Sequence, residues 1–227
     1  MNTKLTVRSL YFASSVTLPP NRENSRKQLQ PYSLIKGDDD RQRCAWCEEH
    51  PLYISYHDNE WGVPVFKDRA HFEFIVLESA QAGLSWLTVL RKRKAYRKAY
   101  ANFDIDKIAS WGVNEIETLM NNSGIIRNRK KIEASISNAR AFIEISTRHG
   151  SFANWLLEFF DGEILINNWK TIDEIPGTTL RAIIIAKELK AAGFRFIGPT
   201  ITYAHLQATG IVNDHLVGCW KRQNQTQ

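Results

Sequence analysis

The sequence predicts an all-α fold, and three observations support that prediction. Apolar residues recur every three to four positions through most of the chain after residue 67, which is the period of an amphipathic helix. Ser, Asp, Asn, Thr and Gly flank these segments, where they favour helix starts and helix ends. No run of six residues alternates between apolar and polar side chains as a half-buried strand does.

The composition predicts one folded domain with an extension at each end. The chain has 227 residues, of which 43% are hydrophobic and 11% aromatic, and this is enough apolar surface for a core. Residues 1–40 show no helical or strand period, so we expect a flexible extension over 1–40, a domain over 41–221 and a short tail over 222–227. Residues 1–37 contain one acidic and six basic residues, a balance shared with organellar transit peptides, although a disordered tail is the simpler interpretation.

Charge and cysteine content narrow the functional class only slightly. A net charge of +6 is weak support for a polyanionic partner. Three cysteines cannot all pair with one another, which favours a reducing compartment over a disulfide framework. No apolar run approaches the length of a membrane span. We therefore expect a cytoplasmic protein, or an organellar one if residues 1–40 are a transit peptide, that does not bind membranes.

The first helix is predicted over residues 67–83. Four residues fall on one face of it at helical spacing: Phe72, Ile75, Val76 and Ser79. Gly83 ends this helix, and Ser85 can cap a second helix that begins at Trp86.

Two short helices follow, over residues 104–110 and 114–120, and each begins with a side chain that can cap it, Asp104 and Asn114. A long helix is predicted over residues 127–145. Its apolar stripe contains Ile132, Ile136, Ala139 and Ile143. Residues 151–160 form another short helix, and residues 162–169 form an irregular connection.

The last third of the chain predicts a helix-hairpin-helix element. Residues 179–192 form a helix, Gly193 suits the left-handed conformation that ends it, and Pro199 suits the first turn of the next helix. A hairpin this short exposes backbone N–H groups that can hold a phosphate. Glycine turns between helices are also common in other helical proteins, so this signal alone is not specific.

Two basic clusters without acidic residues lie on predicted helices. Residues 91–98 carry six positive charges, and the second cluster contains Arg127, Arg129, Lys130 and Lys131. Charge runs are often only solvated helix faces. We favour phosphate contacts because each cluster is expected to open a helix beside a glycine turn.

Four residues near the two ends of the domain have the composition of a zinc site. Cys44 and His57 lie in one polar stretch, and His215 and Cys219 form a His-x3-Cys pair near the C-terminus. Two thiolates and two imidazoles are a ligand set that zinc uses in closed tetrahedral sites. Taken singly, each residue is more simply a buried cysteine or a surface histidine. Cys47 is an alternative ligand, because Cys44-x2-Cys47 is itself a zinc-binding spacing.

Six motifs in order resemble 3-methyladenine DNA glycosylase I, a family of the helix-hairpin-helix glycosylase superfamily, and the resemblance covers about residues 43–219. The motifs are Cys44–Trp46, Tyr53–Gly62, Leu77–Trp86, Gly124–Ile132, Gly193–Gly198 and Val212–His215. The resemblance implies a monofunctional enzyme of base-excision repair that hydrolyses the N-glycosidic bond of 3-methyladenine in alkylated double-stranded DNA after base flipping. It also implies one structural zinc ion, held by Cys44, His57, His215 and Cys219 rather than by Cys47. We expect a monomer.

The same resemblance implies roles for further residues. Glu78, Trp86 and Tyr56 match catalytic positions of the pocket, and Trp46 and Tyr53 match aromatic positions that contact the base. From their places in the glycine turns and the second basic cluster, we expect seven residues to contact DNA: Gln81, Gly83, Leu84, Arg129, Lys130, Gly193 and Gly198.

The residue types give an independent reason for this pocket. Glu78 follows the apolar stretch Phe74–Leu77, where an unpaired carboxylate is costly, so a polar group must meet it. N3-alkylated adenine is cationic, and aromatic faces with a carboxylate favour a cation. Core packing is the alternative for Trp86 and Tyr56. Leu84 lies on a turn and can wedge into the gap left by a flipped nucleotide.

Two other functions agree with parts of the sequence. A zinc hydrolase needs an open metal position, which four protein ligands would not leave. A non-catalytic, zinc-containing helix-hairpin-helix DNA-binding module would keep the hairpin and the basic clusters but has no use for Glu78 among aromatic residues. No lysine is placed as a nucleophile, so β-lyase activity is not expected. Asp214 is interpreted as a partner of the zinc ligands or a helix cap.

Overall fold

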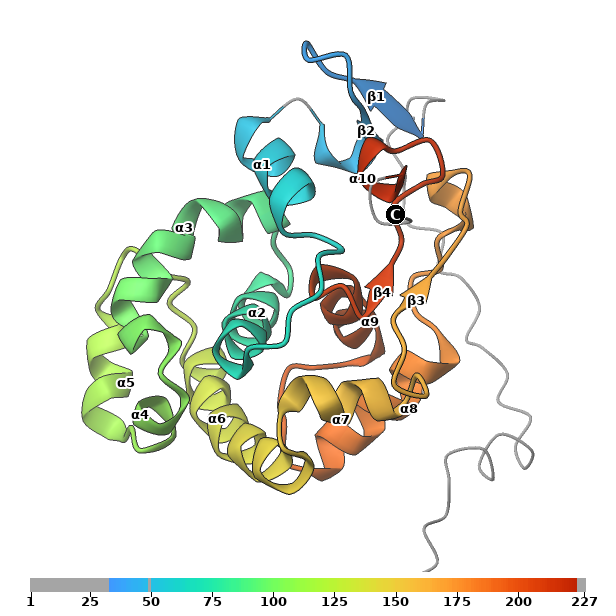
Figure 1. Ribbon diagram of the computed structural model, residues 1–227. Coiled ribbons are helices and arrows are strands. Elements are labelled where there is room, and N and C mark those ends of the chain that lie inside the picture. Colours follow the sequence, from blue (N-terminus) through green and yellow to red (C-terminus); the bar gives the residue numbers. More distant parts are fainter. Residues whose placement is uncertain (1–32, 49, 224–227) are drawn as a thin grey trace, which may run out of the picture. The chain divides into compact units, whose positions relative to one another are not determined.

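The computed structural model describes residues 33–48 and 50–223, and most of them belong to helices (Figure 1). The α-helices are α1 (Pro51–Asn59), α2 (Asp68–Gln81), α3 (Trp86–Ala99), α4 (Ile105–Ala109), α5 (Val113–Met120), α6 (Arg129–His149), α7 (Phe152–Glu158), α8 (Leu180–Ala191), α9 (Pro199–Ala208) and α10 (Trp220–Gln223). Three single 3-10 turns lie between them: η2 (Ala45–Cys47), η3 (Ala101–Phe103) and η4 (Ile172–Glu174). Within the described ranges, no helix is both long enough and apolar enough to cross a membrane.

Helix α2 lies in the interior of this domain. Its residues 74–80 are buried without interruption, and a helix that is buried on nearly all sides belongs to a core rather than to a surface. It packs against α3, α6, α7 and α9, and Figure 1 shows α2 and α9 next to each other with these helices around them. Glu78 belongs to the buried run, so the fold places a carboxylate in the interior.

Most predicted helix starts are confirmed because the capping side chains make the expected hydrogen bonds. Ser85 accepts from the backbone N–H of Thr88 at 3.2 Å, and Asp104 accepts from that of Lys107 at 3.1 Å. The other caps are Asn128, Ser151 and Thr179, which precede α6, α7 and α8. Each cap satisfies an N–H group that has no partner within its helix.

The predicted cap at Asn114 is wrong. Helix α5 begins one residue earlier, at Val113, after Gly112. The carboxylate of Glu115 accepts from the backbone N–H of Gly112 at 2.8 Å. A glutamate at the third helical position can reach back to the cap residue in this way, so it replaces the cap that we assigned to Asn114.

Four short strands were not predicted, and they qualify the all-α class. Strand β1 (Leu34–Lys36) pairs with β2 (Gln42–Cys44) in antiparallel orientation, and β3 (Leu165–Ile166) pairs with β4 (Val212–Asn213) in parallel orientation. Strands of two or three residues are too short to produce an alternating pattern. They matter to the site because β2 ends at Cys44 and β4 leads directly to His215.

The last residues of the predicted N-terminal extension belong to the folded structure. Residues 33–40 contain β1 and the turn that follows it, and Asp39 is paired with Arg43 at 2.6 Å. Residues 1–32 lie outside the described residues. At the other end, Arg222 belongs to α10 and donates to the carbonyl of Asn167 at 3.3 Å.

Candidate functional site

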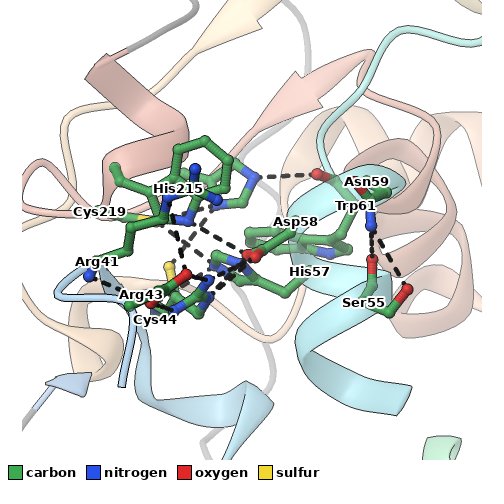
Figure 2. Close-up of polar contacts among 12 residues, drawn as sticks. Arg41, Arg43, Cys44, Ser55, His57, Asp58, Asn59, Trp61, His215 and Cys219 are labelled. Atoms are coloured by element: carbon green, nitrogen blue, oxygen red, sulfur yellow. Dashed lines mark hydrogen bonds and ion pairs between the residues drawn. The ribbon is translucent and has the colours of Figure 1, made fainter. Parts of the chain in front are cut away.

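The four predicted metal ligands meet in one buried cluster, which Figure 2 shows between the two ends of the domain. Cys44 ends β2, His57 lies in the last turn of α1, and His215 and Cys219 lie between β4 and α10. The ligand atoms all lie within 4.8 Å of one another. The sulfur of Cys219 is 3.5 Å from Nε2 of His57 and 3.6 Å from Nδ1 of His215, and tetrahedral zinc with bonds of about 2.3 Å to sulfur and about 2.0 Å to nitrogen requires nearly these separations.

The second nitrogen of each imidazole is already engaged. Nδ1 of His57 lies 2.8 Å from Oδ1 of Asp58, and Nε2 of His215 donates to the carbonyl of Trp61 at 3.0 Å. These contacts leave Nε2 of His57 and Nδ1 of His215 directed at the cluster, which is how outer partners orient metal-binding histidines. The buried guanidinium of Arg43 binds Asp58 at 2.7 Å and holds that carboxylate in place.

The donor set can hold one zinc ion without Cys47. Cys47 is as buried as the other two cysteines but does not belong to the cluster. A hydrogen bond from Cys44 lowers the pKa of Cys219, and the same contact together with burial raises the pKa of Cys44. Two adjacent buried thiolates repel each other, and a divalent cation between them would favour the ionised form of both.

Asp214 is a structural residue of the loop that carries His215. Its buried carboxylate accepts four hydrogen bonds, two on each oxygen. The donors and distances are Asn167 at 2.7 Å, Trp169 at 2.8 Å, Tyr203 at 2.5 Å and Gln207 at 2.7 Å. With every lone-pair direction used, this carboxylate is not placed to accept a proton from a substrate.

A cavity of about 330 Å³ lies next to the metal cluster. Six predicted residues line it: Trp46, Tyr53, Tyr56, Glu78, Gln81 and Trp86. Much of the remaining wall was not indicated by the sequence, and it consists of Ile172, Ile175, Ala204, Gln207 and Ala208. A mostly apolar cavity of this size with one carboxylate among its lining residues is typical of a site for a small aromatic ligand.

The aromatic residues of the cavity hold one another by edge and tilted ring contacts. Trp46 meets Tyr53 with ring centroids 6.0 Å apart, and Tyr56 meets Trp86 at 5.6 Å. The hydroxyl of Tyr53 also accepts from the backbone N–H of Leu87 at the start of α3, at 3.1 Å. Trp46 lies 5.4 Å from the ring of His57, so the metal cluster and the cavity share a wall. The aromatic rings that line the cavity are therefore preorganised for a planar ligand.

Glu78 presents one free oxygen in this cavity. Its side chain is only 4% exposed. Oε2 lies 2.9 Å from Nδ1 of His205, whereas Oε1 has no hydrogen-bond partner among the described residues. Burial raises the pKa of Glu78 well above its ordinary value. An unpaired buried oxygen costs stability unless a ligand satisfies it, so Oε1 identifies the position of a polar or cationic ligand.

The turn between α2 and α3 projects away from the core. Gly83 has a φ of 83°, which favours glycine, and the side chain of Leu84 is 42% exposed. The ammonium of Lys131 donates to the carbonyls of Ala80 at 2.9 Å and Ala82 at 2.7 Å. Lys131 therefore holds the C-terminal end of α2 and is not available as a phosphate contact.

The predicted hairpin between α8 and α9 is present. Gly193 has a φ of 101° and Gly198 caps α9 before Pro199. The side chain of Asn138 holds the hairpin through two bonds to the backbone of Arg195, donating to its carbonyl at 3.1 Å and accepting from its N–H at 2.8 Å. Both glycines have open space where a Cβ would lie. The N–H groups of Gly193, Phe194 and Arg195 already donate within the protein, so a phosphate would have to meet the later part of the hairpin, residues 196–198.

The interpretation of the two basic clusters needs correction. Residues 91–98 lie in the middle and end of α3 rather than at its start. In that cluster Arg93 pairs with Glu60 at 2.5 Å and with Glu73 at 2.6 Å, and Arg97 also pairs with Glu73. Arg129 starts α6 but pairs with Glu117 at 2.5 Å. Acidic residues distant in the sequence therefore neutralise several charges that we expected to meet phosphates.

Sequence reasoning missed two buried histidines behind the cavity. His71 of α2 is fully buried, His205 of α9 is 5% exposed, and Nδ1 of His71 lies 3.1 Å from Nε2 of His205. No local motif marks either residue. The only signal in the sequence is that each histidine lies at a position where the helical spacing predicts a buried residue.

Comparison with known proteins gives a consistent result. The sequence model of the methyladenine glycosylase family matches residues 46–222. DNA-3-methyladenine glycosylase 1 of Escherichia coli strain K12 is 45% identical over 178 residues, which cover 78% of this chain and 95% of the relative. DNA-3-methyladenine glycosylase of Haemophilus influenzae is 42% identical over 177 residues, which cover 78% of this chain and 96% of the relative.

Solved structures agree with these relatives. A crystal structure of 3-methyladenine DNA glycosylase I superposes with a TM-score of 0.76 at 49% identity, covering 79% of this chain and 98% of the other. The Staphylococcus aureus enzyme, in a structure that concerns 3-methyladenine recognition, superposes with a TM-score of 0.77 at 34% identity, covering 79% and 96%.

Proposed function

Because this chain belongs to the methyladenine glycosylase family, we infer that it is a DNA-3-methyladenine glycosylase. It removes 3-methyladenine from alkylated DNA by hydrolysing the N-glycosidic bond, which is a step of base-excision repair. One observation in the structure carries this function: Glu78, which lines an aromatic cavity, has a buried carboxylate oxygen without a hydrogen-bond partner among the described residues.

The chemistry of the alkylated base suits such a cavity. Adenine methylated at N3 in DNA is a cation, and it leaves the sugar as a neutral base. The leaving group is therefore already activated, and the enzyme mainly needs to hold the cationic base and to stabilise charge as the bond breaks. Tyr56 and Trp86 contribute aromatic rings to the wall of the cavity, and Oε1 of Glu78 contributes a carboxylate oxygen without a partner.

The substrate is proposed to be double-stranded DNA whose damaged nucleotide turns out of the helix. A base can enter this cavity only after extrusion from the stack. The exposed Leu84 at the end of α2 is suited to fill the gap that remains, and Gln81 lies beside it at the rim of the cavity. The backbone of the Gly193–Gly198 hairpin and the exposed Lys130 are proposed to contact phosphates. A monomer suffices, because one chain supplies the whole cavity.

The metal is proposed to be one zinc ion with a structural role. The support is the donor set of two thiols and two imidazoles, with ring nitrogens oriented by Asp58 and Trp61. Four protein ligands leave no position for a metal-bound water, so bound zinc would supply rigidity rather than a nucleophile. The ion would hold β2, α1 and the loop after β4 beside the wall of the cavity that contains Trp46.

Two competing functions make different use of these residues. A zinc hydrolase requires an open metal position, and the closed donor set argues against it. A non-catalytic DNA-binding module would retain the hairpin. It would have no reason to bury Glu78 with one unsatisfied oxygen, because that oxygen lowers stability without a ligand.

Single-turnover release of 3-methyladenine from methylated duplex DNA tests this function. Glu78→Gln and Trp86→Ala should each slow release roughly 10- to 1000-fold, if one pocket interaction contributes about 1.4–4 kcal/mol in the transition state. Duplex binding should change little, because phosphate contacts supply most of the affinity.

Glu73→Gln is a matched control. Glu73 lies on the same helix but faces Arg93 and Arg97 outside the cavity, so its substitution should lower the melting temperature and leave the release rate near that of the wild type. Equal release rates for the wild type, Glu78→Gln and Trp86→Ala would remove these residues from the reaction and leave a DNA-binding domain.

A further inference from the structure

A continuous chain of hydrogen bonds leads from the cavity into the core. Oε2 of Glu78 lies 2.9 Å from Nδ1 of His205, Nε2 of His205 lies 3.1 Å from Nδ1 of His71, and Nε2 of His71 lies 2.8 Å from the carbonyl oxygen of Val65. We call these four groups the histidine chain. Its three side chains are all buried, and they come from α2 and α9.

The far end of the histidine chain determines which atoms carry protons. The carbonyl of Val65 can only accept, so Nε2 of His71 must donate to it. A neutral imidazole has one N–H group, so Nδ1 of His71 accepts from Nε2–H of His205. One proton then remains for the contact between Nδ1 of His205 and Oε2 of Glu78, and it can reside on either atom.

Both positions of that proton leave the histidine chain without net charge. With the proton on Oε2, Glu78 is a neutral acid and both imidazoles are neutral. With the proton on Nδ1, Glu78 is a carboxylate and His205 is an imidazolium. The ring of Phe152 packs against both imidazoles, with centroids 5.7 Å from His71 and 6.1 Å from His205, so water does not replace these partners on that side.

Burial favours the first arrangement when the cavity is empty. Desolvation raises the pKa of Glu78 and lowers the pKa of His205 to about 3, and desolvation together with His205 lowers that of His71 to about 3. Tyr56 of α1 also faces Glu78, and its phenol stays neutral because burial, together with the charge of Glu78, raises the pKa of Tyr56 well above its ordinary value. An ion pair would need a charged group in the cavity to become the preferred form.

We propose that His205 and His71 are positioning residues of the glycosylase: they hold Glu78 as a neutral acid while the cavity is empty, and His205 takes the Oε2 proton when a cationic base enters. This rests on the proposed function. In that step the O–H bond of Glu78 breaks and an N–H bond of His205 forms. No proton enters or leaves the protein, and the carboxylate charge develops beside the cation.

The geometry makes this transfer favourable only for a cationic ligand. Oε1 is the atom without a partner, so the negative charge can face the base directly. The imidazolium lies behind the carboxylate, on the side of Oε2, so its repulsion of the cation acts over a longer distance than the attraction of the carboxylate. A neutral base is neither attracted by the carboxylate charge nor repelled by the imidazolium in this way, so it should leave the proton on Glu78.

Nitrogen NMR of the full-length protein, labelled with 15N in histidine, tests the proposal directly. The probes are the 3,9-dimethyladeninium cation, in which a methyl group replaces the sugar so that no base can be released, and 3-methyladenine at mildly alkaline pH, where it is neutral. The cation should convert His205 from a neutral imidazole to an imidazolium, and 3-methyladenine should not. The proposal is overturned if the cation saturates the cavity while His205 stays neutral, or if His205 is an imidazolium in the empty protein.

Variants separate proton transfer from packing. In His205→Gln the amide can still donate to Glu78 but cannot take its proton, so single-turnover release should fall roughly 10- to 100-fold. His71→Leu removes the group that orients His205 and should give a smaller loss. Phe103→Leu, the control, truncates a fully buried ring that stacks on Tyr100 instead of on the imidazoles, and it should lower the melting temperature while release stays within about twofold of the wild type.

These results are distinguishable from a failure of the proposed function. Wild-type protein that releases no 3-methyladenine from methylated duplex would overturn the function itself. Wild-type release together with an unchanged rate in folded His205→Gln would overturn only the role of the histidine chain. If His205→Gln does not fold, the NMR measurement on the wild-type protein decides.

Discussion

Replacing Cys219 with alanine tests the metal centre sharply, because Cys47 provides a matched control. Both thiols are fully buried, but only Cys219 belongs to the ligand cluster. Cys44 and His215 are 171 positions apart along the chain, so a bound metal would close a loop that spans nearly the whole domain. A cross-link over such a loop restricts the unfolded chain by an amount equivalent to at most ~5 kcal/mol.

The loss of this cross-link should be visible in thermal unfolding. For a chain of this size, ~5 kcal/mol corresponds to a decrease in melting temperature of about 10–20 °C. Cys219→Ala should therefore lose the metal and unfold at a much lower temperature. Cys47→Ala should keep the metal and lose only about 1 kcal/mol, as for an ordinary small core truncation. A chelator should lower the melting temperature of the wild type and of Cys47→Ala, and should have little further effect on Cys219→Ala.

The assay is elemental analysis of protein purified without a chelator, followed by calorimetry of each variant. A wild-type protein without stoichiometric metal would refute the reasoning. So would a pattern in which Cys47→Ala loses zinc while His57→Ala retains it, because that pattern would transfer the ligand role to Cys47.

Three further predictions concern DNA binding and the domain boundary. The affinity for duplex DNA should fall steeply with salt concentration whatever the DNA sequence, and a flat salt dependence in fluorescence anisotropy would count against phosphate docking. Lys130→Glu should raise KM more than it slows base release. Arg129→Glu should do the same and also lower the melting temperature, because it breaks the pair with Glu117. Leu84→Ala should slow base release from duplex DNA more than from single-stranded DNA, because only the duplex leaves a gap in its base stack when the nucleotide turns out. Equal losses in single-turnover assays on both substrates would show that Leu84 does not fill this gap. A chain that begins at Ser33 should keep full activity and an unchanged melting temperature. Removal of β1 as well should lower the melting temperature, because the pairing of Leu34–Lys36 with β2 is lost. Calorimetry of both truncated chains tests this prediction.

Local signals in the sequence were sufficient for most of the helices. Ser85, Asp104 and Thr179 make the capping bonds expected of them, and Gly193 and Pro199 end and begin helices as predicted. These features depend on neighbours within about four residues, so the sequence contains the whole interaction. The short strands were missed because two or three residues carry no period.

The chemical identity of the candidate site was also readable from the sequence. Residue types and a family resemblance singled out Glu78 and the cluster of Cys44, His57, His215 and Cys219, and the structure brings those four into one buried group. Zinc has strong preferences for ligand type, so a ligand set can be identified before its geometry is known.

Only the tertiary structure decided which partner each polar group has. Glu78 and His205 are 127 positions apart, and His71 and His205 are 134 apart, so no local pattern could join them into one chain or show that Oε1 is the free oxygen. The same reason explains why the pairing of Arg129 with Glu117 on a neighbouring helix was not foreseen, while its contact with DNA stays a prediction. Hydrogen bonds and ion pairs form across distances of about 3 Å in space, and a sequence does not specify those distances until the helices have packed.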